Sequence, residues 1–162
     1  MTNIHSQKIN PCLWFDTNAE EAVNFYTSVF KNSKKLAVSY YADGAPMPKG
    51  SILTISFQLL GQNFLALNGG PDFKFTEAVS FIVNCETQEE IDYYWENLSK
   101  DGGAEIECGW LKDKFGLSWQ IVPPIITELM SSEHPEKSTR VMQAILKMKK
   151  LDLKTLKQAY AG

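Results

Sequence analysis

The stretch ILTISFQLLGQNFLALN, residues 52–68, decides the fold class of this chain. Apolar and polar side chains alternate through residues 52–60, as they do in a β-strand that buries one face. Gly61-Gln62 then predicts a hairpin turn into a second strand at 64–68. One face of the first strand carries Leu53, Ile55, Phe57 and Leu59, and the other carries Thr54, Ser56 and Gln58.

A strand, a helix and a further strand are predicted before this pair. Residues 9–16 and 34–41 have the composition and alternation of strands. Between them, Thr17 and Glu20 have the spacing of a capping box, in which a hydroxyl and a carboxylate bond the first free N–H groups of a helix. The first part of the chain therefore predicts a βαβββ unit.

The same order of elements returns later in the chain. Thr87 and Glu90 repeat the capping box, 87 − 17 = 70 residues after the first one. Strands are predicted around this second helix at 79–85, 105–110, 111–114 and 118–122. We interpret the pattern as a duplicated βαβββ module, at about 8–70 and about 78–123, which makes the fold class α+β.

Helices are predicted after the duplicated region. Pro123-Pro124 end the strand pattern, and amphipathic helical stretches follow at about 124–162. Asp152 is placed to cap the last of them. Because the duplicated pattern is already complete, we expect this helical extension to be an appendage that the core can fold without.

Composition argues against several classes of protein. The 162 residues carry a net charge of −3 and a pI of about 5.4, so we expect neither nucleic acid nor a membrane surface as a partner. No apolar run approaches the ~18 residues that suggest a membrane span, and the first residues show no signal-peptide pattern. Cys12, Cys85 and Cys108 form no paired motif, which is typical of a cytoplasmic protein with reduced thiols.

Several stretches carry a family resemblance: PCLWFD at 11–16, EAVNFY at 21–26, LNGGP at 67–71, KFGLSWQIVP at 114–123, and residues 140–144 and 149–152. Together they resemble the PhnB-like family of the vicinal-oxygen-chelate superfamily, which includes glyoxalases, bleomycin-resistance proteins and dioxygenases. The resemblance implies one glyoxalase-like domain over 1–162, with paired modules whose sheets curve around a cup. It also implies a homodimer.

Some relatives are labelled ubiquinone methyltransferases, but the residues of this chain do not support that chemistry. A nucleotide-like cofactor is typically held by a strand that runs into a GxGxxG turn, and the sequence has no such turn. Asp101-Gly102-Gly103 follows a predicted helix instead. We therefore expect no cofactor of this kind.

Glyoxalase-type relatives place four metal ligands on the cup faces of the first and last strands of each module. The resemblance puts Asn10, Ser80 and Gln120 at three of these positions, with Asn68, or less readily Ala66, at the fourth. Neutral amides and a hydroxyl hold a divalent cation weakly, because zinc and related metals prefer imidazole, thiolate or carboxylate.

The histidines give no alternative metal site. His5 and His134 are the only two in the sequence, and neither lies on a predicted strand. A site with two histidines and one carboxylate therefore cannot be assembled in the cup. We expect the protein to hold no metal.

Strand parity predicts which side chains face the cup. The candidate ligand-binding residues are Asn10, Cys12, Trp14, Ser56, Asn68, Ser80 and Gln120. The opposite, apolar face is expected to pack beneath the helices and carries Leu13, Phe15, Ile55, Phe57, Leu65, Leu67, Phe81, Val83, Trp119 and Ile121. Neutral amides both donate and accept hydrogen bonds, so they suit a polar, uncharged or carbonyl-bearing ligand.

Each candidate also has a purely structural interpretation. Trp14 is more often a core residue than a ligand platform. Asn68 is equally typical of a turn before Gly69-Gly70, and Gln120 of an amide that bonds only its neighbours. Cys12 has no histidine nearby in the pattern to activate it as a nucleophile. The catalytic residues, if any, stay unknown at this point.

The leading hypothesis is a small-molecule-binding protein, or an enzyme of unassigned chemistry, that uses a polar cup without metal. Two alternatives stay open. One is a lyase, isomerase or dioxygenase with a weakly held divalent ion, and the other is a dimeric resistance protein that sequesters a drug. Whether the protein is an enzyme at all is not decided by the sequence.

Overall fold

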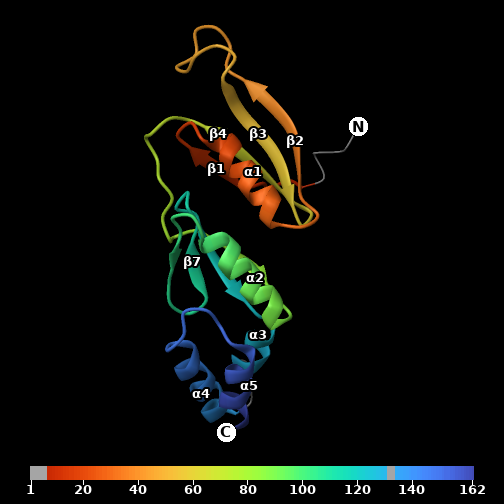
Figure 1. The fold of residues 1–162 in the computed structure, drawn as a ribbon, viewed down its shortest axis with the longest axis vertical. Helices are drawn as coiled ribbons and strands as arrows, with labels where there is room; N and C mark the ends of the chain where they lie inside the picture. Colours follow the sequence, from red (N-terminus) through yellow and green to blue (C-terminus); the bar gives the residue numbers. More distant parts are fainter. Residues whose placement is uncertain (1–6, 131–133) are drawn as a thin grey trace. The chain divides into compact units, whose positions relative to one another are not determined.

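The computed structural model describes residues 7–130 and 134–162. The chain forms two compact units, Met1–Lys74 and Phe75–Gly162, and their boundary falls between the two predicted modules. Each unit contains a four-stranded sheet with a helix over one face (Figure 1). In the described ranges no helix is long and apolar enough to cross a membrane.

The first unit is a βαβββ module. Its elements are β1 (Cys12–Phe15), α1 (Ala19–Val29), β2 (Lys34–Tyr40), β3 (Ile52–Leu59) and β4 (Gln62–Asn68). The sheet order is β1-β4-β3-β2, with β1 parallel to β4 and the other neighbours antiparallel.

The second unit repeats this topology. Its module consists of β5 (Ser80–Asn84), α2 (Gln88–Ser99), β6 (Ala104–Glu105), β7 (Trp110–Lys112) and β8 (Ser118–Val122). The sheet order is β5-β8-β7-β6, again with one parallel pair, β5 with β8. Order and strand directions match those of the first unit, so the α+β class and the predicted duplication are confirmed.

Aromatic packing joins α1 to its sheet. Tyr26 of α1 is fully buried and stacks on Phe57 of β3, with ring centroids 6.3 Å apart. Phe57 in turn stacks on Phe64 of β4 at 5.3 Å. Ala19 and Ala22 are also fully buried, because their small side chains let the helix approach the sheet closely. The apolar face predicted for β3 is thus the face that α1 covers.

Only the second of the two predicted capping boxes forms. The Thr87 hydroxyl accepts a hydrogen bond from the Glu90 backbone N–H at 3.2 Å, and the Glu90 carboxylate accepts one from the Glu86 N–H at 2.7 Å. The box predicted at Thr17 is wrong, because α1 begins one residue later and its N-cap, Asn18, makes no side-chain cap bond. A distant residue supplies that cap instead, as described below.

The hairpin between β3 and β4 turns one residue earlier than predicted. Leu60 and Gly61 both have positive φ, 48° and 87°, which matches the twist of a two-residue turn. Leu59 therefore pairs with Gln62, and Phe57 with Phe64.

This register corrects the predicted faces of β4. Its buried face carries Phe64, Ala66 and Asn68, while Leu65 and Leu67 lie half-buried on the opposite face. Every position from 64 to 67 is apolar, so hydrophobicity alone did not distinguish the two faces.

The strand predicted at 105–110 is also wrong. Residues 106–109 make a tight turn in which Cys108 and Gly109 both have positive φ, 62° and 82°. Their backbone N–H groups donate to the carbonyls of Met148 and Lys149, each at 2.8 Å. A segment about forty residues later thus provides the hydrogen bonds that a neighbouring strand would otherwise supply.

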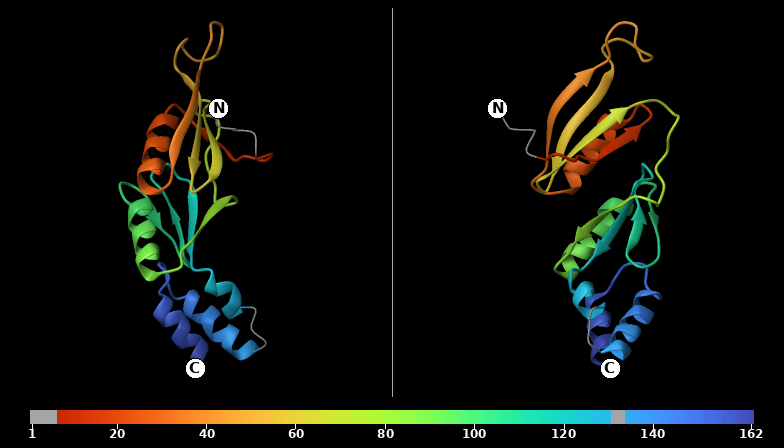
Figure 2. Two further views of the ribbon diagram at one scale, coloured as in Figure 1. Left: turned by 90° about the vertical axis from the view of Figure 1, so that its right-hand side faces the viewer. Right: turned by 180° about the vertical axis from the view of Figure 1, so that it is seen from behind.

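The C-terminal helices belong to the same compact unit as the second module. They are α3 (Ile125–Met130), α4 (Pro135–Ile145) and α5 (Leu153–Ala161), and they pack side by side (Figure 2). Their own core contains Leu129, Val141, Ile145, Leu151 and Leu156, and Cys108 packs against it. The predicted cap forms, since Asp152 accepts from the Thr155 N–H at 2.6 Å.

Candidate functional site

The open face of the second sheet brings together the polar groups of β5 and β8. The indole N–H of Trp95 on α2 donates a hydrogen bond to the Glu105 carboxylate. Glu105 pairs with Leu111, and Leu111 pairs with Trp119, so these three side chains lie on one face of the sheet. This is the face that α2 covers. The face opposite α2 carries, by register, Ser80 and Ile82 of β5, Ser118 and Gln120 of β8, and Trp110 and Lys112 of β7.

Gln120 lies at the centre of this face. Its amide Nε2 donates to the Ser80 hydroxyl at 2.8 Å, so the two predicted site residues are in direct contact. Among the described residues no group donates to the Gln120 side-chain oxygen. Gln120 is flanked across the strands by Ile82, which is 58% exposed, and by half-buried Trp110. The amide is therefore held in one orientation with its acceptor open.

Ser118 provides a second unused polar group on the same face. It is two residues before Gln120 on β8, and it pairs with Ser80 on one side and Lys112 on the other. Its hydroxyl is completely buried, and within the described parts of the chain it has no hydrogen-bond partner. Buried hydroxyls nearly always have a partner, so an unpaired one points to a missing water molecule or ligand.

Lys112 brings a positive charge to this face. Its ammonium forms an ion pair with the carboxylate of Glu77, which lies in the segment before β5. The ammonium lowers the pKa of the Glu77 carboxyl by hydrogen bonding, so the carboxylate stays ionised near neutral pH.

Asp113 is a buried carboxylate next to this site, but its oxygens are already used. They accept hydrogen bonds from the backbone N–H groups of Phe115 and Leu117 and from the indole of Trp119. Trp119 belongs to the face that α2 covers, so Asp113 stabilises the β7–β8 connection and does not reach the open face. We assign it no chemical role.

The open face of the first sheet is less polar than predicted. Cys12 pairs with Leu65, and Trp14 with Leu67, so the leucines lie beside the two predicted site residues. Ser56 shares this face and also pairs with Leu65. Thr54 is already bonded, since its hydroxyl lies 2.6 Å from that of Ser39. Apart from Ser56, this face offers few free polar groups.

Trp14 supports the segment that follows β4. Its indole N–H donates to the Gly70 carbonyl at 2.8 Å, and its ring meets Phe73 edge to face at 4.9 Å. The ring also lies so close to Gly69 that a methyl group there would come within 2.3 Å of it. These contacts give Trp14 a structural role, while part of its ring stays accessible.

Asn68 lies on the other face of the sheet, and its predicted position on the cup face is corrected. It pairs with Phe15 and is only 6% exposed. Its side-chain oxygen accepts from the Ala19 N–H at 2.9 Å, and its amide donates to the Ile52 carbonyl at 3.0 Å. Asn68 therefore caps α1 on the helix side of the sheet, away from the open face.

Asn10 and Cys12 lie at the beginning of the first unit, before and at the start of β1. Asn10 precedes β1, which is shorter than predicted, and its exposed amide donates to the Gln7 carbonyl at 3.0 Å. Partial burial raises the pKa of the Cys12 thiol, which opposes formation of the nucleophilic thiolate. Both residues belong to the first unit, whereas Gln120 and Ser80 belong to the second.

The residues on these faces fit a metal poorly. The second face offers an amide, two hydroxyls and an ammonium that would repel a cation. Within 7–130 and 134–162, no three His, Cys, Asp or Glu side chains cluster closely enough to hold a metal ion. His134 is the N-cap residue before α4, and its Nδ1 lies 3.9 Å from a Glu136 carboxylate oxygen, while His5 is outside the described residues.

Sequence reasoning missed Ser118, Lys112, Trp110 and Ile82 as members of the site. Alternation along β8 could have found Ser118, because it shares parity with Gln120. Trp110 and Lys112 required the true start of β7, which the wrong strand at 105–110 concealed.

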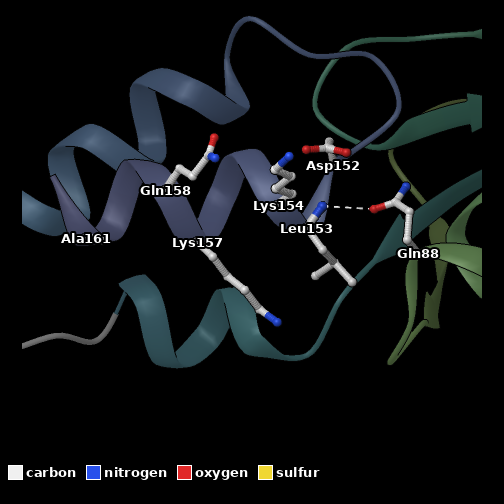
Figure 3. A pocket seen from close by; sticks show the side chains of 7 residues that line it. All are labelled: Gln88, Asp152, Leu153, Lys154, Lys157, Gln158 and Ala161. Carbon is white, nitrogen blue, oxygen red and sulfur yellow. Dashed lines mark hydrogen bonds between the residues drawn. The ribbon is translucent and has the colours of Figure 1, made fainter.

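A hollow of about 490 Å³ lies elsewhere in the second unit, along α5 (Figure 3). Its lining includes Lys154, Lys157 and Gln158 of α5 and Gln88 of α2, whose side-chain oxygen accepts from the Leu153 N–H. Asp152 already caps this helix end with its carboxylate. The hollow is shallow and contains none of the predicted site residues, so we favour the open sheet face as the site.

The chain matches the model of a known protein family. The model of the family described as 3-demethylubiquinone-9 3-methyltransferase matches residues 7–122, which span both modules. No curated protein matches the chain significantly.

Solved structures resemble the chain at different levels. A PhnB protein from Bacillus cereus, provisionally described as a 3-demethylubiquinone-9 3-methyltransferase, is 39% identical with a TM-score of 0.65, and the match covers 72% of this chain and 99% of that one. Protein PA1353 from Pseudomonas aeruginosa is 22% identical, with a TM-score of 0.57 and coverages of 70% and 95%. The fosfomycin resistance protein FosX from Listeria monocytogenes is 15% identical, with a TM-score of 0.54 and coverages of 80% and 100%. The last two show the fold alone.

Proposed function

We propose, from the premise that this chain belongs to the PhnB-like family of the vicinal-oxygen-chelate superfamily, that it is a small-molecule-binding protein. Its ligand binds on the open face of the second sheet, and binding does not use a glyoxalase-type metal. The observation that carries the proposal is the geometry of Gln120. The Ser80 hydroxyl fixes its amide at 2.8 Å, and its oxygen is left as an open acceptor.

The neighbours of Gln120 support binding of a ligand that is part polar and part apolar. Ser118 adds a buried hydroxyl with no partner in the described chain, and an unpaired buried polar group costs about 1–3 kcal/mol. Ile82 and Trp110 add apolar surface on either side of the amide. A few convergent polar groups beside apolar surface are typical of small-molecule sites.

The side chains on the open face of the second sheet make it a poor metal site. Gln120, Ser80 and Ser118 supply only neutral oxygens, and Lys112 supplies a positive charge. A metal-dependent lyase, isomerase or dioxygenase needs stronger ligands in this position. We therefore place metal-dependent chemistry second, and a stoichiometric bound metal would reverse this order.

The glycine-rich turns of this chain do not form the cofactor site that a methyltransferase would need. Such an enzyme needs a cofactor cradle, commonly a glycine-rich turn that leads from a strand into a helix. Gly69 follows β4, but the ring of Trp14 fills the space beside it. Gly103 follows α2, and a side chain there would collide with the Ser99 and Lys112 carbonyls. Both glycines are thus explained by close packing, and the family name does not transfer as an activity.

A Gln120→Leu variant tests the proposal. A library of small polar compounds is screened by ligand-observed NMR against the native protein, and each hit is then titrated into the variant. We expect Gln120→Leu to abolish binding while the free energy of unfolding stays nearly unchanged. Gln62→Leu, an exposed amide in the β3–β4 hairpin, is the matched control and should keep native affinity.

The opposite result would refute the assignment. A loss of stability of about 1–3 kcal/mol with intact ligand affinity would show that Gln120 only pairs with Ser80. We also propose a homodimer, which sedimentation analysis tests. Tight binding of a drug across such a dimer would favour the sequestration alternative.

A further inference from the structure

One charged pair on the open face of the second sheet plays no part in the fold of the sheet itself. Lys112 extends from β7, and its ammonium contacts the Glu77 carboxylate from the segment before β5. The two side chains are 33% and 55% exposed. An ion pair this accessible contributes little to stability, typically under about one kcal/mol. Competing anions can therefore displace Glu77 easily.

The position of Lys112 connects this ion pair to the proposed site. Lys112 and Ser118 are directly paired across β7 and β8, and Gln120 is the next residue of β8 on the same face. Trp110, the preceding residue of β7 on that face, pairs with Gln120. An ammonium, an unpaired hydroxyl and an open amide oxygen thus lie in adjacent positions of one sheet. With Ile82 and Trp110 beside Gln120, the face has a cationic end, a hydrogen-bonding amide and an apolar border, while the Ser118 hydroxyl lies buried between Lys112 and Ser80.

We propose that Lys112 is the subsite for a carboxylate group of the ligand, and that Glu77 occupies this subsite as an internal substitute in the free protein. This inference rests on the proposed function, because it specifies the ligand of the same face. When the ligand binds, its carboxylate replaces that of Glu77 at the Lys112 ammonium, so the ammonium stays paired. Glu77 is released toward solvent, where its charge is hydrated.

The surrounding residues narrow the ligand class. The subsite contains one ammonium and no guanidinium, so it suits a single negative charge better than a doubly charged phosphate. Ile82 and Trp110 suit an apolar or aromatic body attached to the carboxylate. The Gln120 oxygen accepts a hydrogen bond, so a hydroxyl or amide N–H elsewhere in the ligand fits it. The class is a small monocarboxylic acid with a hydrophobic body.

The experiment compares benzoate with benzamide, which has the same ring and a neutral amide in place of the carboxylate. Both are titrated by ligand-observed NMR into the native protein and three variants, Lys112→Gln, Glu77→Gln and Asp43→Asn. The third is the matched control, since it removes the partner of Lys49 in an exposed ion pair of the first unit. Urea unfolding confirms that each variant is folded.

We expect native protein to bind benzoate more tightly than benzamide. Glu77→Gln removes the internal competitor, so the affinity for benzoate should rise by up to about five-fold, which corresponds to the free energy of an exposed ion pair. The affinity for benzamide should not change. Lys112→Gln should lower the affinity for benzoate to that for benzamide. Asp43→Asn should change neither affinity. Equal binding of the two probes, or identical benzoate affinity in native protein and Glu77→Gln, overturns the carboxylate subsite.

The result also separates this inference from the proposed function. If neutral compounds bind and Gln120→Leu abolishes their binding, while Lys112→Gln leaves the affinity for benzoate unchanged, the face is a binding site without an anion subsite. If no compound depends on Gln120, the proposed function fails as well.

Discussion

The side-chain oxygen of Asn68 accepts a hydrogen bond from the backbone N–H of Ala19 at 2.9 Å, across 49 residues of chain. The first free N–H groups of a helix are normally satisfied by the residue just before it. In α1 that residue, Asn18, makes no such bond, and the last residue of β4 replaces it. The cap thus ties the start of α1 to the end of the sheet it covers.

Replacement of Asn68 should therefore destabilise the first unit. Asn68→Ala removes the cap and leaves the Ile52 carbonyl without its donor, so we expect a loss of about 1–3 kcal/mol in urea unfolding. Asn68→Asp keeps the acceptor beside the positive helix end and should lose less. Asn10→Ala, at an exposed asparagine, is the control. Equal stability of the two alanine variants would contradict the capping role.

Gly69 should tolerate no side chain while Trp14 is present. The ring of Trp14 would lie 2.3 Å from a methyl group at this position, so Gly69→Ala should cost about 1–3 kcal/mol and shift the tryptophan fluorescence. In a double-mutant cycle, Trp14→Leu should remove most of that cost, because the smaller side chain leaves room. Strictly additive effects would show that the clash is relieved elsewhere.

The C-terminal helices should be necessary for the second unit. Leu151 is 1% exposed, and it lies two residues after Lys149, whose carbonyl accepts the Gly109 N–H. Leu151→Ala should cost about 2–5 kcal/mol, whereas Leu146→Ala, at a side chain that is 62% exposed, should cost little. Truncation after Ser132 should abolish cooperative unfolding of the second unit. A truncated chain that unfolds cooperatively would instead support the appendage expected from the sequence.

Purified protein should contain no stoichiometric transition metal. Among the described residues, no three imidazole, thiolate or carboxylate groups come together at Gln120 and Ser80, and the one carboxylate on this face, that of Glu77, is already paired with the Lys112 ammonium. Elemental analysis is done on protein expressed in metal-supplemented medium after removal of any affinity tag. One zinc, iron, nickel or manganese ion per chain would contradict the expectation.

Cys85 should be inert toward thiol reagents in the folded protein. Burial, with a smaller contribution from the Glu90 charge, raises the pKa of its thiol to about 12, so at pH 8 almost none of the protein carries the Cys85 thiolate. Its reactivity should rise only at strongly alkaline pH or on unfolding. Titration with a chromogenic disulfide at pH 8, in native protein and in Cys85→Ser, should give the same number of reactive thiols. A lower number in the variant would show that Cys85 is accessible.

The elements whose signal lies within a few residues were predicted well. The alternation of β3 gave the buried face on which Tyr26 stacks, and Thr87 and Glu90 marked the start of α2. The alternation around Trp119 and Ile121 correctly placed Gln120 on the open side of β8. These predictions succeeded because side-chain period and helix capping depend on neighbouring residues.

The failures share a different cause. The faces of β4, the turn at Cys108 and the cap of α1 all depend on partners far along the chain. No local pattern indicates that Met148 will accept a bond from Cys108, or that Asn68 will reach Ala19. At Leu65 and Leu67 hydrophobicity even indicates the wrong face, because the hairpin register decides which side of the sheet they occupy.

By itself, the sequence determined the duplicated βαβββ order, the α+β class and the polar character of β8, because each follows from local periodicity. Only the tertiary structure decided which polar groups meet. It brought Gln120 to 2.8 Å from Ser80, and it removed Asn68 from the open face. It also placed Lys112 beside Ser118. The register of these strands depends on how they pair, and a shift of one residue would move every side chain of a strand to the other face of the sheet.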